Sequence, residues 1–410
     1  MKINSEVIRS TINHENIFSV FQPIINLKTR RIVAVESLCR GRFKNEIIPP
    51  YYLFDYAAKL DGKMLLKLEI ISQRKAIREY FEHPIAPMLA LNVSPDILNG
   101  VGSFSEMDLS HLDNPDIAPK SIILETPYTA AKDAHFCIFL QYMRFCGHKI
   151  SLDSIDDNPE CLTAISKIRP DFVKIDRDFV INIEHDGAKQ ELLSSICDVS
   201  KKYGSSIIAE GVETIQEVTA CMICGCDLVQ GFYFTKPVPL ADFPEEEINE
   251  KIEAAAGNIT DSVISKYTNE RIKKFTSKEL ISELLILLSE ADEVEYENVM
   301  YNFLQNYDDI ECIYLIDSEG KQISDTIISV DSIPADPASV YAPSVKGDSH
   351  VLKNYFYAVI EDIENPFISD QYVSDATGNL CITVSSKLAG KDGKPIVVCI
   401  DVKIRQRNDY

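Results

Sequence analysis

The feature that most restricts the fold of this sequence is a strand-and-helix pattern repeated through about residue 240. A short apolar, β-branched run ends in one or two polar residues, and a longer segment with helical spacing follows it. Eight such runs occur, at residues 18–24, 32–38, 88–94, 121–126, 149–155, 172–176, 205–211 and 228–234. Between most of them lie helical segments such as residues 63–81 and 189–204. The pattern predicts an α/β protein with a (β/α)8 barrel, and a doubly wound sheet is the alternative.

The pattern changes after residues 237–250. Residues 259–307 have the apolar spacing of one or two helices. Strand-like runs with period two follow, separated by turn residues, between residues 310 and 404. We therefore expect a barrel domain over residues 1–245, a helical connector over 246–300, and an antiparallel α+β domain over 301–410.

The charge balance is strongly acidic. Asp and Glu number 63 against 41 Lys and Arg, which gives a formal net charge of −22. Such a surface repels phosphate backbones and anionic lipids, so polymeric nucleic acid and a membrane surface are disfavoured as partners. A small phosphorylated ligand in a focused pocket is not excluded. No apolar run approaches ~18 residues and the N-terminus has no apolar core, so we expect no membrane span, no signal peptide and a cytoplasmic protein.

The eleven cysteines do not predict a disulfide framework. Most lie in apolar runs, where a free thiol packs like a small hydrophobic side chain. Cys221, Cys224 and Cys226 form the one cluster, and no fourth Cys or His lies nearby at zinc-ligand spacing. We expect these thiols to pack under a helix end. Because the seven histidines form no HxxxH or HExxH pair, any metal would have oxygen ligands.

Polar side chains stand where each predicted strand ends. They are Gln22, Glu36, Asn92, Glu125, Asp153, Lys174, Glu210 and Gln230. The strand ends of a (β/α)8 barrel meet at one rim, so we expect these side chains to converge. Crowded carboxylates need a neutralising cation, and Glu, Asn and Asp oxygens suit Mg²⁺ or Mn²⁺. A metal, a lysine and a spare glutamate can hydrolyse phosphate esters, although strand ends are also polar simply because they meet solvent.

These residues resemble the EAL domain, the phosphodiesterase family that hydrolyses cyclic di-GMP to linear pGpG. The family's Glu-Ala-Leu signature is similar to Glu36-Ser37-Leu38, and Arg40 follows as in the family. The other similar segments keep the family's order: residues 21–27, 91–95, 123–125, 173–176, 209–214 and 230–237. The resemblance covers about residues 15–240.

The resemblance implies a role for each site residue. The metal ligands would be Glu36, Asn92, Glu125 and Asp153, with Mg²⁺ or Mn²⁺ as cofactor. Glu210 would be the general base, and Lys174 would orient the attacking water or the phosphate. The residues that hold cyclic di-GMP or support its site would be Gln22, Leu38, Arg40 and Gln230.

Two positions depart from the family's pattern. The family has Asp-Asp-Phe-Gly after its fifth strand, whereas this sequence has Asp153-Ser154-Ile155-Asp156. The second metal-binding aspartate and the glycine are therefore absent, and Asp156 or Asp157 would have to compensate. Tyr128 stands where the family has a glutamate that supports this loop. Two functions stay open: a metal-dependent phosphodiesterase regulated by its C-terminal domain, and a catalytically weak receptor for cyclic di-GMP.

The C-terminal segments at 313–324, 355–361, 368–388 and 392–404 resemble Cache domains, which are PAS-like sensors. The resemblance implies a pocket for a small ligand of unknown identity, with Lys353 and Asp375 as counterparts of the family's cation and aspartate. A ligand-free dimerisation module is the alternative, and we expect a homodimer.

Overall fold

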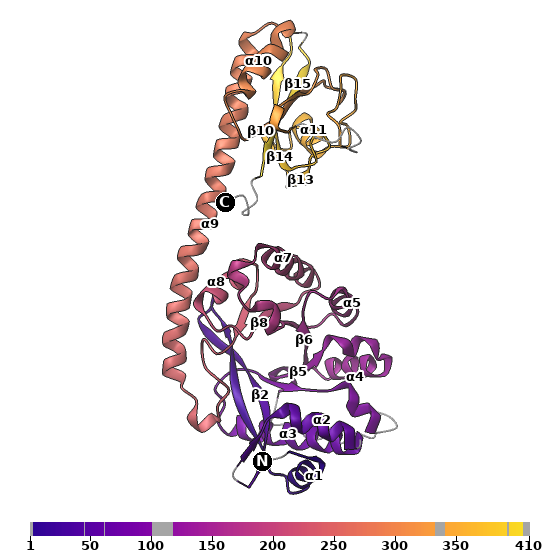
Figure 1. Cartoon of the computed structure of the whole chain (residues 1–410), viewed down its shortest axis with the longest axis vertical. Coiled ribbons are helices and arrows are strands. Elements are labelled where there is room, and N and C mark those ends of the chain that lie inside the picture. The colour runs from indigo at the N-terminus through magenta and orange to yellow at the C-terminus, as the bar shows by residue number, and fades with distance from the viewer. Residues whose placement is uncertain are drawn as a thin grey trace. The chain divides into compact units, whose positions relative to one another are not determined.

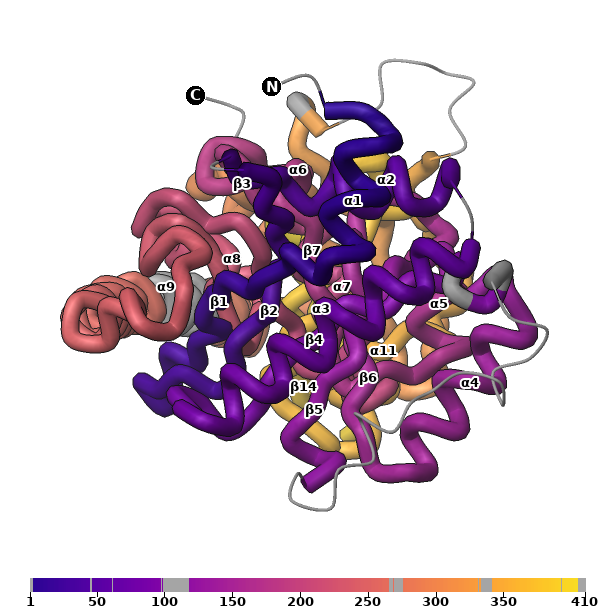
Figure 2. The backbone as a smooth tube through the Cα atoms, turned by 90° about the horizontal axis from the view of Figure 1, so that it is seen from below, coloured from indigo at the N-terminus to yellow at the C-terminus, as the bar shows by residue number. Residues whose placement is uncertain are grey.

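The computed structural model describes residues 3–44, 46–60, 62–100, 118–332, 341–391 and 393–404. The chain folds into two compact units, Met1–Val263 and Ile264–Tyr410. Figure 1 labels the elements of both units, and Figure 2 traces the backbone from a second direction.

Eight strands of the first unit close into a barrel. Seven of them pair in parallel in the order β2, β4, β5, β6, β7, β8 and β9. Their bounds are β2 Arg31–Phe43, β4 Leu89–Asn92, β5 Ile122–Pro127, β6 Lys149–Ile155, β7 Phe172–Ile175, β8 Ser206–Glu210 and β9 Leu228–Gln230. The strand β1 (Ile17–Asn26) closes the barrel between β2 and β9. The predicted closed α/β barrel is confirmed, and the doubly wound alternative is wrong.

The first strand departs from a regular (β/α)8 barrel. Residues 27–30 join β1 to β2 without a helix, so β1 runs antiparallel to β2 and to β9. Gln22 and Glu36 face each other in the register of this pair, well inside both strands. The prediction that these two stand at strand ends was therefore wrong. The run predicted over 228–234 is also shorter, because β9 ends at Gln230. A short strand β3 (Glu46–Ile48) pairs antiparallel with the C-terminal end of β2.

Helices cover the outside of the barrel. They are α1 Ser5–Asn13, α2 Pro50–Leu60, α3 Gly62–Glu82, α4 Ala134–Phe145, α5 Pro159–Ile168, the short α6 Arg177–Val180, α7 Gly187–Lys202 and α8 Ile215–Ile223. The helices predicted over 63–81 and 189–204 correspond to α3 and α7. Outward-facing strand residues such as Val35, Leu124 and Val173 pack against these helices in the main apolar core. Gly204 follows α7 with a φ of 84°, the left-handed conformation that ends many helices.

A second, smaller apolar layer lies inside the barrel. It contains Ile24, Ala34, Ala90, Ile123, Ile208 and Leu228. Since alternate residues of a strand face the same side, the residue two positions beyond each also faces the interior. In the parallel strands these residues are Glu36, Asn92, Glu125, Glu210 and Gln230. In β1, which runs the other way, the matching residue is Gln22, two positions before Ile24. One polar layer therefore lies directly above the apolar one.

The helix α9 (Glu245–Glu290) contributes to the cores of both units. Near its start, Ile248, Ile252 and Ala255 belong to the main core of the first unit. Near its end, Ile281, Leu284 and Leu288 belong to the core of the second. The division at residues 245 and 300 that the sequence predicts stays a prediction.

The second unit is built on one antiparallel sheet. The strand order is β11-β10-β15-β14-β12, and β13 also pairs with β14. The bounds are β10 Ile310–Ile316, β11 Ile327–Ile328, β12 Phe367–Ile368, β13 Tyr372–Val373, β14 Leu380–Ala389 and β15 Pro395–Lys403. The end of α9 and α10 (Tyr296–Leu304) pack on one face of the sheet. The helix α11 (Asn354–Ile360) packs on the other face.

The eleven cysteines are all free thiols, so the absence of a disulfide framework is confirmed. Cys221, Cys224 and Cys226 are buried in the barrel core near the end of α8, as predicted. Among the residues that the structure describes, no helix is both long and apolar enough to cross a membrane.

Candidate functional site

A buried lysine lies at the centre of the polar layer inside the barrel. The side chain of Lys174, from β7, is fully buried. Its Nζ lies 2.9 Å from Glu36 Oε2, 3.2 Å from Glu125 Oε2 and 3.8 Å from Glu210 Oε2. Three carboxylates that are far apart in sequence therefore converge on the lysine, as the sequence predicts. The fourth predicted carboxylate, Asp153, is half-buried at the end of β6 and forms no salt bridge with a described residue.

Two predicted amide side chains donate to Glu36, and a third predicted amide, Gln22, contacts one of them. Asn92 Nδ2 donates a 3.1 Å hydrogen bond to Glu36 Oε1, and Gln230 Nε2 donates a 2.7 Å hydrogen bond to Glu36 Oε2. Gln230 Nε2 also lies 3.3 Å from Gln22 Oε1. Gln22 in turn donates to the backbone carbonyl of Thr235, which follows β9. Both oxygens of the Glu36 carboxylate therefore accept hydrogen bonds, which fixes its orientation.

The lysine divides the carboxylates by their ionisation. Burial alone would raise the pKa of Glu36. The charge of Lys174 and the hydrogen bonds from Lys174, Asn92 and Gln230 outweigh burial and lower that pKa. Burial raises the pKa of Glu125 well above its usual range, and Lys174 offsets this only in part. Burial also raises the pKa of Glu210 to about 8. Burial disfavours the charged form of Lys174, yet the surrounding carboxylates hold its pKa well above the ordinary value. Glu36 is thus the carboxylate most firmly ionised at neutral pH.

The oxygen atoms of the site suit a hard divalent cation. Glu125 Oε1 and Gln230 Oε1 are buried, and neither has a hydrogen-bond partner among the described residues. Such oxygens need a donor or a cation. Across the described parts of the chain, however, no three His, Cys, Asp or Glu side chains already form a metal-binding group. The residues present therefore fit the predicted metal by chemistry, while Lys174 supplies the positive charge in this arrangement.

Strand β6 continues past Asp153 to Ile155, with an irregularity at Ser154. A bulge interrupts the pairing of β6 with β7 between Leu152 and Ile155. Ser154 occupies it with a φ of 60° and donates its backbone N–H to Asp153 Oδ1 at 2.7 Å. The strand then resumes, because Ile155 pairs with Ile175. The pairing of β6 with β7 is therefore retained on both sides of Ser154.

Neither nearby aspartate replaces the missing carboxylate in this structure. Asp156 Oδ1 accepts hydrogen bonds from the backbone N–H of Asn158 and from the Cys161 thiol, at 2.9 and 3.2 Å. Asp157 is exposed. The hydroxyl of Tyr128 accepts a 3.2 Å hydrogen bond from Asn158 Nδ2, so the tyrosine supports the same loop by a neutral contact.

Leu38 and Arg40 lie on the same face of β2 as Glu36, two and four residues farther along. Arg40 is partly buried, and its Nη1 donates to the backbone carbonyl of Cys39 at 2.8 Å. It forms no ion pair with any described residue. The guanidinium therefore keeps donors for a ligand.

Sequence reasoning missed two supporting residues on α3. Gln73 Nε2 donates to the carbonyl of Asn92 at 3.0 Å, and Glu69 Oε1 accepts from the backbone N–H of Ser94 at 3.0 Å. Both side chains are buried and fix the chain where it leaves β4. A signal was present in the sequence, since Glu69 and Gln73 are polar residues four apart on the apolar face of a helix. The carbonyl of Thr235 was also missed, and no side-chain pattern indicates it.

Solved structures with the same fold include two that contain an EAL domain. The Bacillus subtilis YkuI protein, crystallised in complex with substrate c-di-GMP and calcium, matches with a TM-score of 0.74 at 19% identity. That match covers 99% of this chain and 100% of YkuI. The Xanthomonas citri FimX EAL domain in complex with c-diGMP matches with a TM-score of 0.51 at 19% identity, over 58% of this chain and 94% of FimX. At these identities the likeness shows a shared fold.

Sequence relatives point to the same family. The probable cyclic di-GMP phosphodiesterase PdeI of Escherichia coli is 27% identical over 247 residues, which cover 57% of this chain and 30% of PdeI. The cyclic di-GMP phosphodiesterase TpdA of Vibrio parahaemolyticus is 27% identical over 214 residues, covering 52% of this chain and 36% of TpdA. The chain thus matches only about a third of the length of these relatives. The model of the EAL domain family matches residues 5–237, more than half of the chain. The chain belongs to the EAL domain family.

Proposed function

We propose that the barrel domain binds cyclic di-GMP and hydrolyses it to linear pGpG with the help of a divalent metal, Mg²⁺ or Mn²⁺. The observation that carries the proposal is the buried cluster of Lys174 with Glu36, Glu125 and Glu210. A fully buried ammonium among carboxylates is costly to assemble for stability alone. Groups with strongly shifted pKa values that converge in this way are typical of catalytic sites. The phosphodiesterases among the relatives support the same substrate.

Each residue of the cluster has a role in this reaction. Glu36, Asn92, Glu125 and Asp153 would hold the metal, which polarises the phosphoryl group and acidifies water when bound. In its ionised form, Glu210 accepts a proton from the attacking water. The positive charge of a bound metal would favour that form, because it would lower the raised pKa of Glu210. Water adds to phosphorus, the bond from phosphorus to the 3′-oxygen breaks, and that oxygen takes up a proton. Lys174 stabilises the negative charge that develops on the phosphoryl oxygens.

The test is incubation of the purified chain with cyclic di-GMP and Mg²⁺ or Mn²⁺, followed by chromatography for pGpG. Glu210→Gln should lower turnover by about 100-fold or more, because it removes the base. The affinity for cyclic di-GMP, measured by calorimetry, should change little. Glu160→Gln makes the same chemical change at an exposed glutamate and should leave turnover unchanged. Equal turnover of Glu210→Gln and the unmodified protein would refute the role of Glu210.

A second candidate function is that of a receptor, a catalytically weak EAL domain that binds cyclic di-GMP and turns it over slowly. Ser154 carries this alternative, because a neutral hydroxyl is a poor Mg²⁺ ligand and Asp156 is bound within its own turn. A receptor would bind cyclic di-GMP with Ca²⁺ or Mg²⁺ present and release no pGpG. Calorimetry that detects no binding at tens of micromolar would refute both candidates. Arg40→Ala should weaken binding by about tenfold without unfolding the chain, since it removes a donor for the phosphate.

Ser154→Asp distinguishes the two candidates. Asp tolerates the left-handed conformation that Ser154 already has, so the variant should fold. If the missing carboxylate limits turnover, this change should raise the rate by about tenfold or more at saturating metal and leave ligand affinity nearly unchanged. Ser195→Asp adds the same charge at an exposed position of α7 and should change neither quantity. An unmodified protein that turns over about once per second or faster would refute the premise that Ser154 limits catalysis.

The remaining parts of the proposal concern the domains and assembly. We expect a Cache- or PAS-like domain over residues 301–410 that regulates the barrel domain over residues 1–245 through the connector at 246–300. We also expect a homodimer. Light scattering coupled to size-exclusion chromatography should then report twice the chain mass of 46.1 kDa. A monomer at micromolar concentration would contradict the homodimer.

A further inference from the structure

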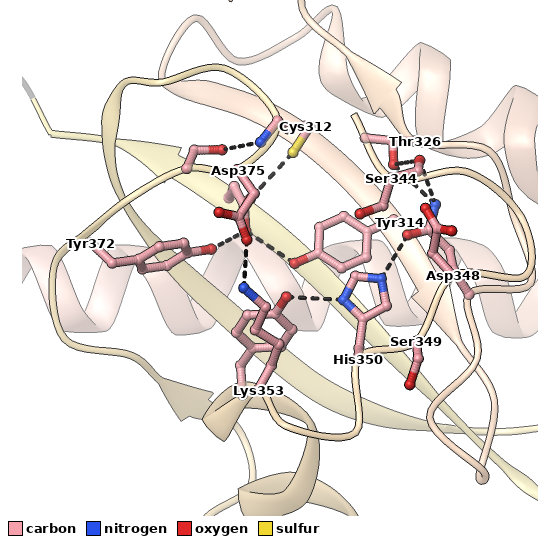
Figure 3. Close-up of a pocket in the computed structure, with 15 residues that line it drawn as sticks. Cys312, Tyr314, Thr326, Ser344, Asp348, Ser349, His350, Lys353, Tyr372 and Asp375 are labelled. Atoms are coloured by element: carbon pink, nitrogen blue, oxygen red, sulfur yellow. Dashed lines mark hydrogen bonds and ion pairs between the residues drawn. The ribbon is translucent and has the colours of Figure 1, made fainter. Parts of the chain in front are cut away.

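The second unit contains a cavity of about 300 Å³, separate from the residues of the barrel site. It lies on the sheet face that carries α11, and Asp401 of β15 and Tyr314 of β10 contribute to its floor. Figure 3 shows Tyr314, His350 and Tyr372 around this space, with Lys353 and Asp375 beside them. A cavity of this size accommodates a small organic molecule rather than a bare ion.

Asp401 is a buried carboxylate with only neutral donors. Its side chain accepts hydrogen bonds from the Thr383 hydroxyl at 2.7 Å and the Cys312 thiol at 3.3 Å. The hydroxyls of Tyr314 and Tyr372 lie at 3.4 Å. Asp401 forms no ion pair with any residue that the structure describes. Burial raises the pKa of Asp401 to about 6 against these hydrogen bonds, so the group is mostly ionised at neutral pH. A buried negative charge without a counter-charge favours a cationic ligand.

His350, which also lines the cavity, does not supply the missing positive charge. Gln322 Nε2 donates to the carbonyls of Ser324 and Ser344, so Gln322 Oε1 is the acceptor facing His350 Nε2. The Nε2 atom therefore carries the ring proton, and Nδ1 accepts from the Tyr355 hydroxyl at 3.0 Å. The imidazole is neutral, and burial lowers its pKa further.

The charges that line the cavity are unbalanced. Three carboxylates, from Asp348, Asp375 and Asp401, stand against one ammonium, from Lys353. Lys353 is already ion-paired with Asp375. This excess of negative charge favours a cationic ligand. Tyrosine rings favour it too, because the face of an aromatic ring attracts cations. The tyrosines in the lining are Tyr314, Tyr355 and Tyr372.

We propose that this cavity binds a small organic amine in its protonated form, with the ammonium group on Asp401 and the carbon skeleton against the tyrosine rings. The Asp401 carboxylate accepts hydrogen bonds from the N–H donors of the ammonium group. The neutral His350 closes one side of the site without repelling a cation. An anionic ligand would instead face the unpaired carboxylates.

The test uses the full chain and a series of four-carbon probes of different charge. Calorimetry would compare putrescine, which is cationic, with 1,4-butanediol, which is neutral, and succinate, which is anionic. Butylamine, with a single ammonium group, serves as a second cationic probe. We expect both amines to bind at least ~30-fold more tightly than the diol and succinate, as a charge-assisted contact in a buried site implies. No binding of either cation at about 1 mM, or binding of succinate as tight as that of putrescine, would overturn the proposal.

Two variants and one control variant locate the binding site. Asp401→Asn keeps the acceptor oxygen for Thr383 but removes the charge, and should weaken binding of the cationic probe by about 30-fold or more. Asp348→Asn makes the same change at an exposed lining residue and should change the affinity by less than about threefold. Tyr372→Leu keeps the charge and removes one ring, so it should weaken binding several-fold even if Asp401→Asn does not fold. Unchanged affinity in both Asp401→Asn and Tyr372→Leu would overturn the proposed site.

Discussion

The barrel site and the C-terminal cavity solve the same physical problem in different ways. Each contains carboxylates that folding removes from water. In the barrel, Lys174 lies within 2.9 to 3.8 Å of three of them. In the cavity, Asp401 has only hydroxyl and thiol donors. The first cluster contains a buried cation among its carboxylates, whereas Asp401 has no cation beside it among the described residues.

The difference follows from the strand arrangement. In the parallel barrel, Glu36 and Lys174 are 138 residues apart and meet because every strand contributes to the same interior layer. In the antiparallel sheet, Asp401 is paired directly with Cys312 and with Thr383 on its two neighbouring strands. Its two nearest donors, from Thr383 and Cys312, are therefore cross-strand neighbours, and neither is charged. A barrel gathers residues from many strands, whereas a sheet position depends on two.

Lys174→Met would remove the buried cation of the barrel site and has the largest expected effect. It leaves Glu36 and Glu125 buried without their cation, and the free energy of unfolding should fall by about 3–5 kcal/mol at pH 7. The loss should be smaller at pH 5, where the carboxylates can take up protons. Denaturant unfolding followed by circular dichroism measures both values.

The matched control for this variant is Lys149→Met. Lys149 forms a partly exposed salt bridge with Asp171, so its loss should cost less than about 1 kcal/mol. If Lys174→Met costs no more than Lys149→Met, the barrel site is not held together by charge. Recovery of stability on adding a divalent cation to Lys174→Met would support metal binding by the same carboxylates.

Asp401→Asn should raise the free energy of unfolding, whereas Lys174→Met should lower it. The folded-state pKa of about 6 exceeds the ordinary value of 3.8, so the charge of Asp401 costs stability fully above pH 6 and not at all below 3.8. Removing the charge should raise the free energy of unfolding of ligand-free protein by about 1–3 kcal/mol at pH 7. Thermal unfolding checks this, with Asp362→Asn as an exposed control. A lower melting temperature for Asp401→Asn would show that the carboxylate is a structural necessity.

Much of the barrel could be predicted from the sequence because strand period and helix spacing are local. The eight strand runs and the helices α3 and α7 follow from that spacing. The direction of β1 was not predicted. It follows from the length of the connection between β1 and β2. Residues 27–30 are too few for the crossover that parallel strands need. The short gap was visible in the sequence, so attention to connection length would have predicted the reversal.

The site was predicted where it depends on strands and missed where it depends on other elements. Glu36, Glu125, Lys174 and Glu210 meet because alternate residues of neighbouring strands share one face. Glu69 reaches this region from a helix, and its contact depends on how α3 packs. Asp401 was not predicted at all, because its burial results from the packing of two neighbouring strands and α11 rather than from a local pattern.

The stability of the barrel unit should depend on pH through Glu210, by less than the effects of Lys174→Met and Asp401→Asn. The pKa of Glu210, about 8, exceeds its ordinary value of 4.5, so the folded state binds more protons between these values. Stability of the metal-free protein should therefore fall as pH rises from about 5 to 8, by at most about 1.4 kcal/mol per pH unit from this group. Unfolding curves in a chelator, compared with those of Glu210→Gln, isolate its share. Equal slopes for the two proteins would contradict the shifted pKa.

The smallest effect is expected for Tyr372→Phe, which tests whether neutral donors alone stabilise Asp401. The Tyr372 hydroxyl contacts both Thr383 Oγ1 and Asp401 Oδ1, and its hydrogen bond lowers the pKa of Asp401 relative to burial alone. Its removal should raise that pKa and reduce the free energy of unfolding at pH 7 by about 0.5–1 kcal/mol. Because the hydroxyl favours the ionised form, the reduction should shrink at pH 5, where Asp401 is mostly protonated. The partial exposure of Tyr372 keeps the effect small, since water can replace part of the contact. A loss of the same size at both pH values would mean that the hydroxyl supports Thr383 rather than the charge of Asp401.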